Sequence, residues 1–353
     1  MTGWVFSDEF LRHNAGLAHP ECPQRLAAIV GRIKDDHLME LLQSVNFGEA
    51  SDAEIALAHD HHYISSLQEA EGTWWDADTF IGEDSPRIAR LAAGGVLAAT
   101  RAVWNGRVAN AFCAVRPPGH HALRGQAMGF CLFNNVAVAA ASTVVENPGA
   151  KVFILDWDAH HGNGTQAIFY DSADILYASV HQYPFYPGTG AAREIGRGAG
   201  IGATVNVPLP GGCGDDEYLV AWDEVVTPAL RRHRPQLILV SGGFDAHQAD
   251  PLAQMHVTEG GYARLTRRLL EVARDAGAPV VFVLEGGYDL GGLGRSVSAV
   301  FQELVRADLV RTGPAADEAP APALDALRGP ARAAIRDARD AQRAAQRREE
   351  SGA

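Results

Sequence analysis

The sequence predicts an α/β fold in which a parallel sheet is covered by helices on both faces. Four short runs of apolar and β-branched residues are typical of buried strands, at residues 151–156, 175–180, 236–241 and 279–284. Longer stretches with helical character lie between them, at residues 86–104, 131–146, 215–232 and 258–276. Apolar strands that alternate with helices form βαβ units, and such units build parallel sheets that are buried on both faces.

Each predicted strand runs directly into a cluster of polar residues. The clusters are Asp156-Trp-Asp158, Ser179-Val-His181, Gly243-Phe-Asp245 and Glu285-Gly-Gly-Tyr288. Open α/β sheets bind their ligands at the carboxyl ends of the strands. We therefore expect a functional site at this edge of the sheet.

The composition changes near Leu309, which predicts three parts in the chain. Residues 1–308 are expected to form the catalytic domain, and residues 309–322, rich in Ala and Pro, a linker. Residues 323–353 are rich in Ala and Arg and predict a helical tail. Its apolar stripe is thin, at Leu324, Leu327 and Ile335, so we expect a helix surrounded by solvent. A docking or dimerisation helix is the alternative.

Charge and composition narrow the classes of partner and location. The chain has 43 acidic and 30 basic residues and a net charge of −13, which argues against nucleic acid and is compatible with a cationic substrate. No apolar run is long enough to span a membrane. The start of the chain has no pattern of a secretory signal, and the four cysteines show no CxxC spacing. We expect a cytoplasmic protein; the oligomeric state stays open, a homodimer included.

The segment after the first predicted strand suggests a metal site. Asp158 and His160 are two residues apart at a strand end, so in extended backbone their side chains face the same side. A carboxylate with an imidazole suits zinc or a similar divalent ion, and catalytic zinc usually has three protein ligands. Asp245 is the best candidate for the third ligand, and His247 competes with it. A hydrogen-bonded pair without a metal is the alternative.

Two further segments carry groups that suit acyl-transfer chemistry. Pro-Pro-Gly in residues 116–122 fixes a rigid turn before His120 and His121, and histidine is the common general acid or base near neutral pH. Ordinary surface or core histidines are the alternative. Tyr288, after two glycines, could donate its hydroxyl proton to a developing oxyanion.

Rival chemistries lack their motifs in this chain. No Gly-x-Ser-x-Gly elbow of a serine hydrolase is present, and no Walker loop. Gly-x-Gly pairs in residues 188–202 do not extend to a full Gly-x-Gly-x-x-Gly pattern, and they lack the strand and helix that a nucleotide fold needs. These absences count against the rival chemistries and leave the metal site as the favoured interpretation.

Taken together, the motifs resemble those of the histone deacetylase family, which includes acetylpolyamine amidohydrolases and acetoin-utilisation proteins. The matching segments occur in the family's order over residues 1–308, and they are Arg-Pro-Pro-Gly-His120-His121, Gly-Phe-Cys131, Asp156-Trp-Asp158-Ala-His160-His161-Gly-Asn-Gly, Tyr186-Pro-Gly-Thr-Gly, Gly-Phe-Asp245 and Glu-Gly-Gly-Tyr288. The Asp-Trp-Asp form is similar to the class II branch and its bacterial relatives. The resemblance implies an arginase-like three-layer α/β/α sandwich on an eight-stranded, mostly parallel sheet.

The resemblance also implies a role for each matching residue. Zn²⁺, or Fe²⁺ in its place, would be held by Asp158, His160 and Asp245, which favours Asp245 over His247. His121 would be the general base and then the acid, His120 paired with Asp156 would give electrostatic support, and Tyr288 would bind the acetyl carbonyl. Class I members have Asp where this chain has Asn163. A neutral Asn stabilises imidazolium less, so we expect a lower pKa for His121 than for His120.

A structural K⁺ is implied as well. Its ligands would be Asp156, Asp158, the His160 backbone, Ser179 and Val180. A hydrogen bond between Ser179 and Asp156 is the alternative. A second, peripheral K⁺ site would use carbonyl groups near Phe169, Ser172 and Ile175.

The substrate expected from the resemblance is an acetylated lysine in a peptide or protein. Phe130, next to Gly129, and Tyr186 match the aromatic pair that walls the family's acyl-lysine tunnel, and Asp78 would lie on its rim. Polyamine-selective relatives have a Glu where this chain has Leu252, so acetylpolyamines and other small acylated amines are the alternative. A non-catalytic module that binds acylated ligands, and an arginase-like ureohydrolase with two metals, are less consistent with these residues.

Overall fold

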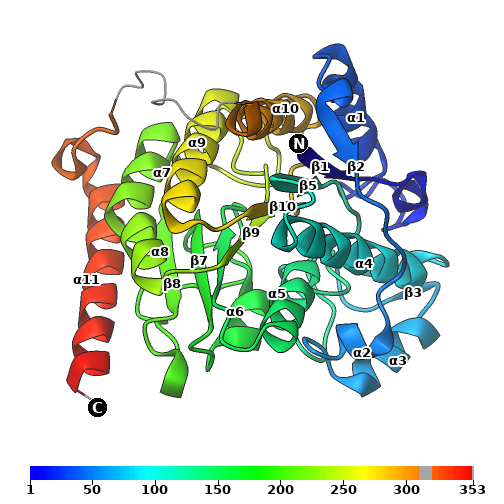
Figure 1. The fold of residues 1–353 in the computed structure, drawn as a ribbon, viewed down its shortest axis with the longest axis horizontal. Helices are drawn as coiled ribbons and strands as arrows, with labels where there is room; N and C mark the ends of the chain where they lie inside the picture. The colour runs from blue at the N-terminus through cyan, green and yellow to red at the C-terminus, as the bar shows by residue number, and fades with distance from the viewer. Residues whose placement is uncertain (310–319, 352–353) are drawn as a thin grey trace.

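The computed structural model describes residues 1–309 and 320–351, and it contains an eight-stranded sheet whose strands all run parallel (Figure 1). The strands lie in the order β2-β1-β5-β10-β9-β6-β7-β8. Their bounds are β1 Thr2–Val5, β2 Leu42–Ser44, β5 Asn110–Cys113, β6 Val152–Asp156, β7 Ile175–Gln182, β8 Thr204–Leu209, β9 Leu237–Gly242 and β10 Val280–Leu284. The predicted parallel, eight-stranded sheet is confirmed.

The central strands are apolar because both of their faces are covered. Every residue of β6, β9 and β10 is buried, as expected for a parallel sheet between two helical layers. The register aligns Asp156, the last residue of β6, with Ser179 of β7 and Ser241 of β9. The carboxyl ends of these strands are therefore level, and the residues that follow them meet.

Helices form a layer on each face of the sheet. One layer contains α1 (Gln24–Asp35), α7 (Asp215–Ala221), α8 (Thr227–His233), α9 (Glu259–Ala276) and α10 (Leu290–Leu309), and the other contains α4 (Ser85–Trp104), α5 (Asn135–Glu146) and α6 (Asn163–Phe169). The predicted three-layer α/β/α sandwich is confirmed. Smaller elements are α2 (Asp52–Ile55), α3 (His61–Glu69), the antiparallel pair β3 (Thr73–Trp74) and β4 (Phe80–Ile81), and the short helices at Asp8–Arg12, Met39–Leu41, Gly198–Gly200 and Leu324–Ala326.

Two predicted helices have different bounds in the structure. The helix expected over residues 131–146 begins at Asn135, because residues 128–131 form a tight turn that ends before the Asn134 side chain caps the helix. The helix expected over residues 215–232 contains a π-helical turn at Trp222–Val226. Pro228 has no N–H to donate to the carbonyl four residues earlier, so a widened turn precedes it.

The C-terminal helix α11 (Gly329–Ser351) packs against the body of the protein, so the expectation of a helix surrounded by solvent is wrong. Ala331, Ile335 and Ala338 are buried. The helix lies along β8, the last strand of the sheet, at one end of the molecule (Figure 1). Gln342 Nε2 donates to the carbonyl oxygen of Thr204 in β8 over 2.7 Å. Most of the predicted linker, residues 310–319, lies outside the described residues.

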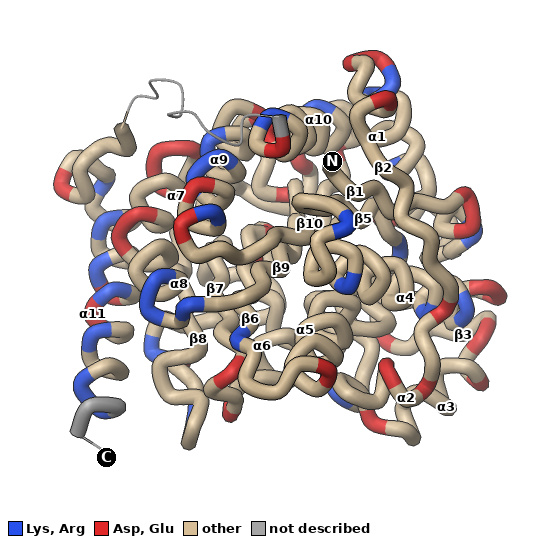
Figure 2. The backbone as a smooth tube through the Cα atoms, in the orientation of Figure 1, with Lys and Arg blue, Asp and Glu red and all other residues tan. Residues whose placement is uncertain are grey.

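Charged residues are spread over many segments of the chain, and α11 carries many of the basic ones (Figure 2). In the part of the chain that the structure describes, no helix combines the length and apolar character needed to cross a bilayer.

Candidate active site

Four neighbouring strands of the sheet, β5, β10, β9 and β6, lead into the predicted functional residues. β5 leads to residues 116–122, β6 leads to Asp158 and His160, β9 leads to Asp245, and β10 leads to Tyr288. Because the strands are parallel, these residues gather at one edge of the sheet. Chain order and spatial order differ, so segments that are far apart in the chain form one site.

The side chains of Asp158, His160 and Asp245 face one point. Their ligand-type atoms all lie within 4.8 Å of one another. His160 Nδ1 lies 2.8 Å from Asp245 Oδ2 and 3.2 Å from Asp158 Oδ1. Both carboxylates are buried, whereas the His160 side chain is 13% exposed, which leaves one side of the group open. Two carboxylates and one imidazole in this arrangement could hold a zinc ion.

Two glycines create the space for these carboxylates. A Cβ atom at Gly243 would lie 2.1 Å from Asp158 Oδ2. A Cβ atom at Gly286 would lie 2.5 Å from Asp245 Oδ2 and 2.6 Å from Asp158 Oδ2. Any larger residue would displace the two carboxylates, so the glycines of the strand-end motifs shape the cradle in which an ion fits.

The electrostatics of the group favour a bound cation. Burial, and then the neighbouring Asp158 charge, raise the pKa of Asp245 to about 7. Although burial opposes protonation of His160, Asp245 and Asp158 raise its pKa to about 10. Without an ion, the imidazolium therefore supplies the positive charge that the two carboxylates need. A divalent cation would supply that charge and leave His160 neutral, which is the form that binds metals.

His247, the competing candidate for the third ligand, faces elsewhere. Its Nδ1 atom accepts the backbone N–H of Ala249 over 3.1 Å, and its Nε2 atom lies 3.4 Å from Glu259 Oε1. It is not among the three residues that face the common point. The geometry therefore favours Asp245.

The two adjacent histidines have opposite electrostatic environments. His120 Nδ1 lies 3.1 Å from Asp156 Oδ2, which also accepts the hydroxyl of Tyr177 over 3.0 Å. Although burial opposes its protonation, Asp158 and Asp156 raise the pKa of His120 to about 10. Burial, and then the positive charges of His120 and His160, hold the pKa of His121 well below its ordinary value. The predicted order of the two pKa values agrees with these directions.

His121 is oriented by a neutral partner. Its Nδ1 atom lies 2.8 Å from Asn163 Oδ1, which can only accept, so Nδ1 carries the proton and Nε2 is free to accept one. Asn163 Nδ2 in turn contacts Met128 Sδ. A neutral imidazole with a bare nitrogen, whose ring centroid lies 6.1 Å from that of His160, has the form of a general base.

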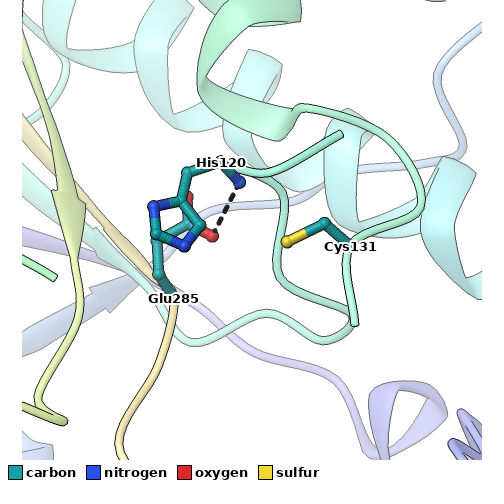
Figure 3. A group of neighbouring side chains, drawn as sticks. All are labelled: His120, Cys131 and Glu285. Carbon is teal, nitrogen blue, oxygen red and sulfur yellow. Dashed lines mark hydrogen bonds between the residues drawn. The ribbon is translucent and has the colours of Figure 1, made fainter. Parts of the chain in front are cut away.

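Glu285, which the sequence placed at a strand end without a role, organises the turn that carries both histidines. Its Oε2 atom accepts the N–H groups of Gly119 and His120, over 2.6 and 3.2 Å, and its Oε1 atom accepts the hydroxyl of Ser241. Figure 3 shows this carboxylate beside His120 and the thiol of Cys131. Burial raises the pKa of Cys131 well above its ordinary value, which favours the protonated thiol. The cluster is therefore a support for the turn.

Arg25 and Glu21 complete the site, and sequence reasoning missed both. Arg25 is buried, donates to the carbonyl oxygens of Gly287 and Glu285, and lies over the Tyr288 ring at 5.0 Å. Glu21 binds both Arg25 and Arg116, the first residue of the histidine segment. Arg25 is 262 residues from Gly287 in the chain, and no local pattern distinguishes it from a surface arginine of a helix.

Aromatic rings surround the approach to the histidines. Phe130 meets Tyr288 edge to face at 5.9 Å, and Tyr186 meets His121 at 5.2 Å. Gly129 has φ +55°, and a Cβ atom there would lie 2.5 Å from His121 Cδ2. Phe130 itself has φ 69°, an uncommon conformation for a residue with a side chain, and it indicates a functional constraint on this turn.

Asp78, the predicted rim residue, and Leu252, the counterpart of the Glu in polyamine-selective relatives, lie on surface loops. Asp78 is half-buried, and its carboxylate accepts the hydroxyl of Thr79, whose Oγ1 atom accepts the N–H of Phe130. Leu252 is also half-buried, and its N–H donates to Asp250. Asp78 is thus joined to the aromatic wall through one intermediate residue.

The residues of the expected K⁺ sites are placed as follows. Ser179 and Val180 lie in β7 next to the end of β6, and the Ser179 hydroxyl lies 2.8 Å from His181 Nδ1. Asp156 is buried and its Oδ1 atom accepts the N–H of Asp158. At the peripheral position, Ser172 N–H donates to the carbonyl of Phe169, and Ile175 N–H donates to the Ser172 hydroxyl.

The chain matches the histone deacetylase domain over residues 19–304. It is 41% identical over 307 residues to the histone deacetylase-like amidohydrolase of Pseudomonas aeruginosa, covering 86% of this chain and 79% of that protein. A probable deacetylase of Archaeoglobus fulgidus is 40% identical over 297 residues, 83% of this chain and 82% of that protein. The crystal structure of the HDA15 HD domain matches 97% of this chain and 95% of its own, with 35% identity and a TM-score of 0.86. The chain therefore belongs to the histone deacetylase family and is an enzyme of the hydrolase class.

Proposed function

We propose that this protein is a zinc-dependent hydrolase that removes acetyl groups from amines, with acetyl-lysine in proteins or peptides as its main substrate. The observation that carries the proposal is the meeting of Asp158, His160 and Asp245 within 4.8 Å, beside a histidine held in the neutral form. The names of the relatives, deacetylase and amidohydrolase, support the same reaction class.

Asp158, His160 and Asp245 would hold the ion. Zinc, when bound, would polarise a water molecule and the acetyl carbonyl group. The same mixture of carboxylate and imidazole ligands would also accept Fe²⁺.

His121 moves the proton in the proposed reaction. Its Nε2 atom accepts a proton from water as the water oxygen attacks the acetyl carbon, because Nδ1 is already committed to Asn163. The imidazolium then returns the proton to the amine nitrogen as the C–N bond breaks. The products are acetate and a free amine.

His120 and Tyr288 act on the charge that develops. The pair of His120 and Asp156 keeps a positive charge next to His121, which favours the neutral form of His121 before the attack. Tyr288 would donate its hydroxyl hydrogen to the acetyl oxygen, where negative charge grows in the transition state.

The entrance supports a substrate with an alkyl chain and a flat amide. Phe130 and Tyr186, with Gly129 between the wall and His121, offer aromatic surface against which a lysine stem would pack. Asp78 would bind the peptide backbone at the rim. Leu252 offers no charge to a second ammonium group, so acetylpolyamines would gain no specific partner there.

A structural K⁺ belongs to the same proposal. Asp156, Asp158, the backbone of His160, Ser179 and Val180 would bind it next to the zinc ligands. The second K⁺ would lie near Phe169, Ser172 and Ile175. We also place the protein in the cytoplasm, where its four free cysteines would remain reduced.

Metal depletion and reconstitution test the proposal. Chelated protein should lose hydrolysis of a fluorogenic acetyl-lysine peptide and regain it as Zn²⁺ is added back. His121→Ala in the zinc-loaded protein should lower kcat by about 10³-fold, because general-base catalysis contributes on that order, while the peptide still binds. Binding without turnover by the zinc-loaded wild type would instead indicate a non-catalytic acyl-binding module. Acetylputrescine and acetylspermidine, assayed on the same preparation, decide between the two substrate classes.

A further inference from the structure

The short segment between β10 and α10 carries Tyr288 and is held by charged side chains. The N–H of Gly286 donates to Asp158 Oδ2 over 2.9 Å. Arg25 Nε donates to the carbonyl oxygen of Gly287 over 2.7 Å. Gly287 has φ +122°, and two adjacent glycines give this backbone many alternative conformations. Bonds from outside the segment therefore decide where Tyr288 lies.

Asp250 is the other charged group that binds this segment. Its carboxylate is buried, and its Oδ2 atom accepts the N–H of Tyr288 over 2.6 Å and that of Asp289 over 3.2 Å. Its Oδ1 atom accepts the N–H of Leu252 over 2.9 Å. Three backbone N–H groups therefore share this one carboxylate. Asp250 also lies on the same loop as Asp245, so one side chain joins the loop of a proposed zinc ligand to the loop of Tyr288.

The Tyr288 hydroxyl makes no hydrogen bond to any residue within 1–309 or 320–351. Its ring is confined by the edge contact with Phe130 and by the Arg25 guanidinium above it. Neither contact fixes how far the hydroxyl reaches toward the metal group. That distance depends on the position of the Tyr288 backbone, and hence on the group that binds its N–H.

We propose that Asp250 is a positioning residue, which holds the Tyr288 backbone so that the tyrosine hydroxyl reaches the acetyl oxygen. The inference rests on the proposed function, because it takes the assignment of Tyr288 to that oxygen as given. Asp250 itself does not contact the reacting atoms.

A purely structural role for Asp250 makes a different prediction. Asp289 caps the N-terminus of α10, since its Oδ1 atom accepts the N–H of Gly292 over 2.6 Å. Asp250 would then serve only to anchor Asp289 and the start of that helix. Its loss would lower stability and leave kcat of the folded enzyme unchanged.

Steady-state kinetics of zinc-loaded, full-length variants separates the two roles. Asp250→Ala should lower kcat by about 10²-fold with KM within about threefold of wild type, because a misplaced group about 1 Å from its position costs on this order. Asp250→Asn keeps one acceptor oxygen and should lose about tenfold. In a Tyr288→Phe background, Asp250→Ala should add less than about threefold, because the group being positioned is gone.

Asp215→Asn is the matched control. Asp215 is partly buried and, like Asp250, its carboxylate accepts a backbone N–H; it accepts the N–H and the hydroxyl of Thr258 at the start of α9, and it does not contact the Tyr288 segment. It should lower the thermal midpoint without lowering kcat. Zinc content is measured for every variant, so that metal loss is not mistaken for mispositioning.

The outcomes are distinct. Wild-type kcat in zinc-loaded Asp250→Ala, or the full 10²-fold loss again in the Tyr288→Phe background, overturns the positioning role alone. A zinc-loaded wild type that does not hydrolyse the peptide overturns the proposed function, and this inference with it. Hydrogen exchange gives a second measurement: the amides of Tyr288 and Asp289 should exchange about tenfold faster in Asp250→Asn than in Asp215→Asn, and equal exchange also contradicts the proposal.

Discussion

The strand ends that form the site and the C-terminal helix α11 contrast in how the sequence specifies them. At the strand ends, residues that follow β6 and β9 meet at one point, and each is a residue type that its chemistry requires. α11 lies beyond residues 19–304, the part that matches the family's domain, and docks through small apolar side chains such as Ala331 and Ala338. Metal binding and catalysis require particular residue types, whereas the packing of an alanine-rich helix surface requires only a complementary shape.

The contrast predicts that variants at the strand ends change activity more than stability. Asp245→Asn should lower kcat/KM by about 10³-fold or more, because a ligand of the proposed zinc site is lost. The metal-free variant should unfold within about 1 kcal/mol of the metal-free wild type, because Asn keeps an acceptor for the N–H of Ala159 and removes a like charge beside Asp158. Zinc content, steady-state kinetics and denaturant unfolding measure the three quantities. A variant that keeps its activity would remove Asp245 from the ligand set.

Removal of α11 should have the opposite effect and change stability more than activity. Deletion of residues 320–353 should lower the free energy of unfolding by about 4 kcal/mol or more, since the buried face of the helix and its bonds to β8 are lost together. The exposed edge of β8 should also promote self-association. kcat/KM of the folded fraction should stay within about threefold of the full chain, because no predicted site residue lies on α11. A truncated protein as stable as the full one would contradict the docking described above.

Substitution of a single buried side chain of α11 tests how much its burial contributes to stability. Ile335 is fully buried, and Ile335→Ala should lower the free energy of unfolding by about 2–4 kcal/mol through lost contacts and the cavity that remains. Asp337→Ala, at an exposed position one half-turn away, is the matched control and should stay within about 0.5 kcal/mol of wild type. Urea unfolding of the three proteins gives the comparison. Equal stabilities for Ile335→Ala and wild type would favour a helix that is only loosely attached.

The sequence alone predicts those parts of the fold in which the local residue pattern matches the burial of the segment in the folded protein. Four strands were predicted because each is a continuous apolar run, and parallel pairing followed from the helices between them. Strands β1, β2, β5 and β8 were not predicted individually. β2 is half exposed and three residues long, and the apolar residues of β8 include a proline. Local composition does not separate such segments from loops.

The site was predictable to the extent that its residues sit in short motifs. Asp158 and His160 are two positions apart, and Asp245 and Tyr288 follow apolar strands. Arg25 and Asp250 lack such a signal, because their role depends on which backbone groups come near them after folding. A charged residue that binds a backbone amide or carbonyl can come from anywhere in the chain.

Among the contacts of α11, those between charged side chains should contribute least to the free energy of unfolding. Arg339 Nη1 lies 2.8 Å from Glu224 Oε2, and both side chains are partly exposed, at 25% and 35%. A double-mutant cycle with Arg339→Met and Glu224→Gln should give a coupling free energy below about 1 kcal/mol, as exposed ion pairs usually do. The coupling should fall further at high salt.

The size of this coupling decides whether the contrast between the two regions holds. A value of several kcal/mol, unaffected by salt, would mean that a specific charge pair anchors α11 to the π-helical turn that contains Glu224. The Arg-rich composition of the tail would then have carried a docking signal that could be recognised in the sequence. A small value leaves shape and burial as the forces that dock the helix, and those become visible only when the opposing surface of β8 and its neighbours is known.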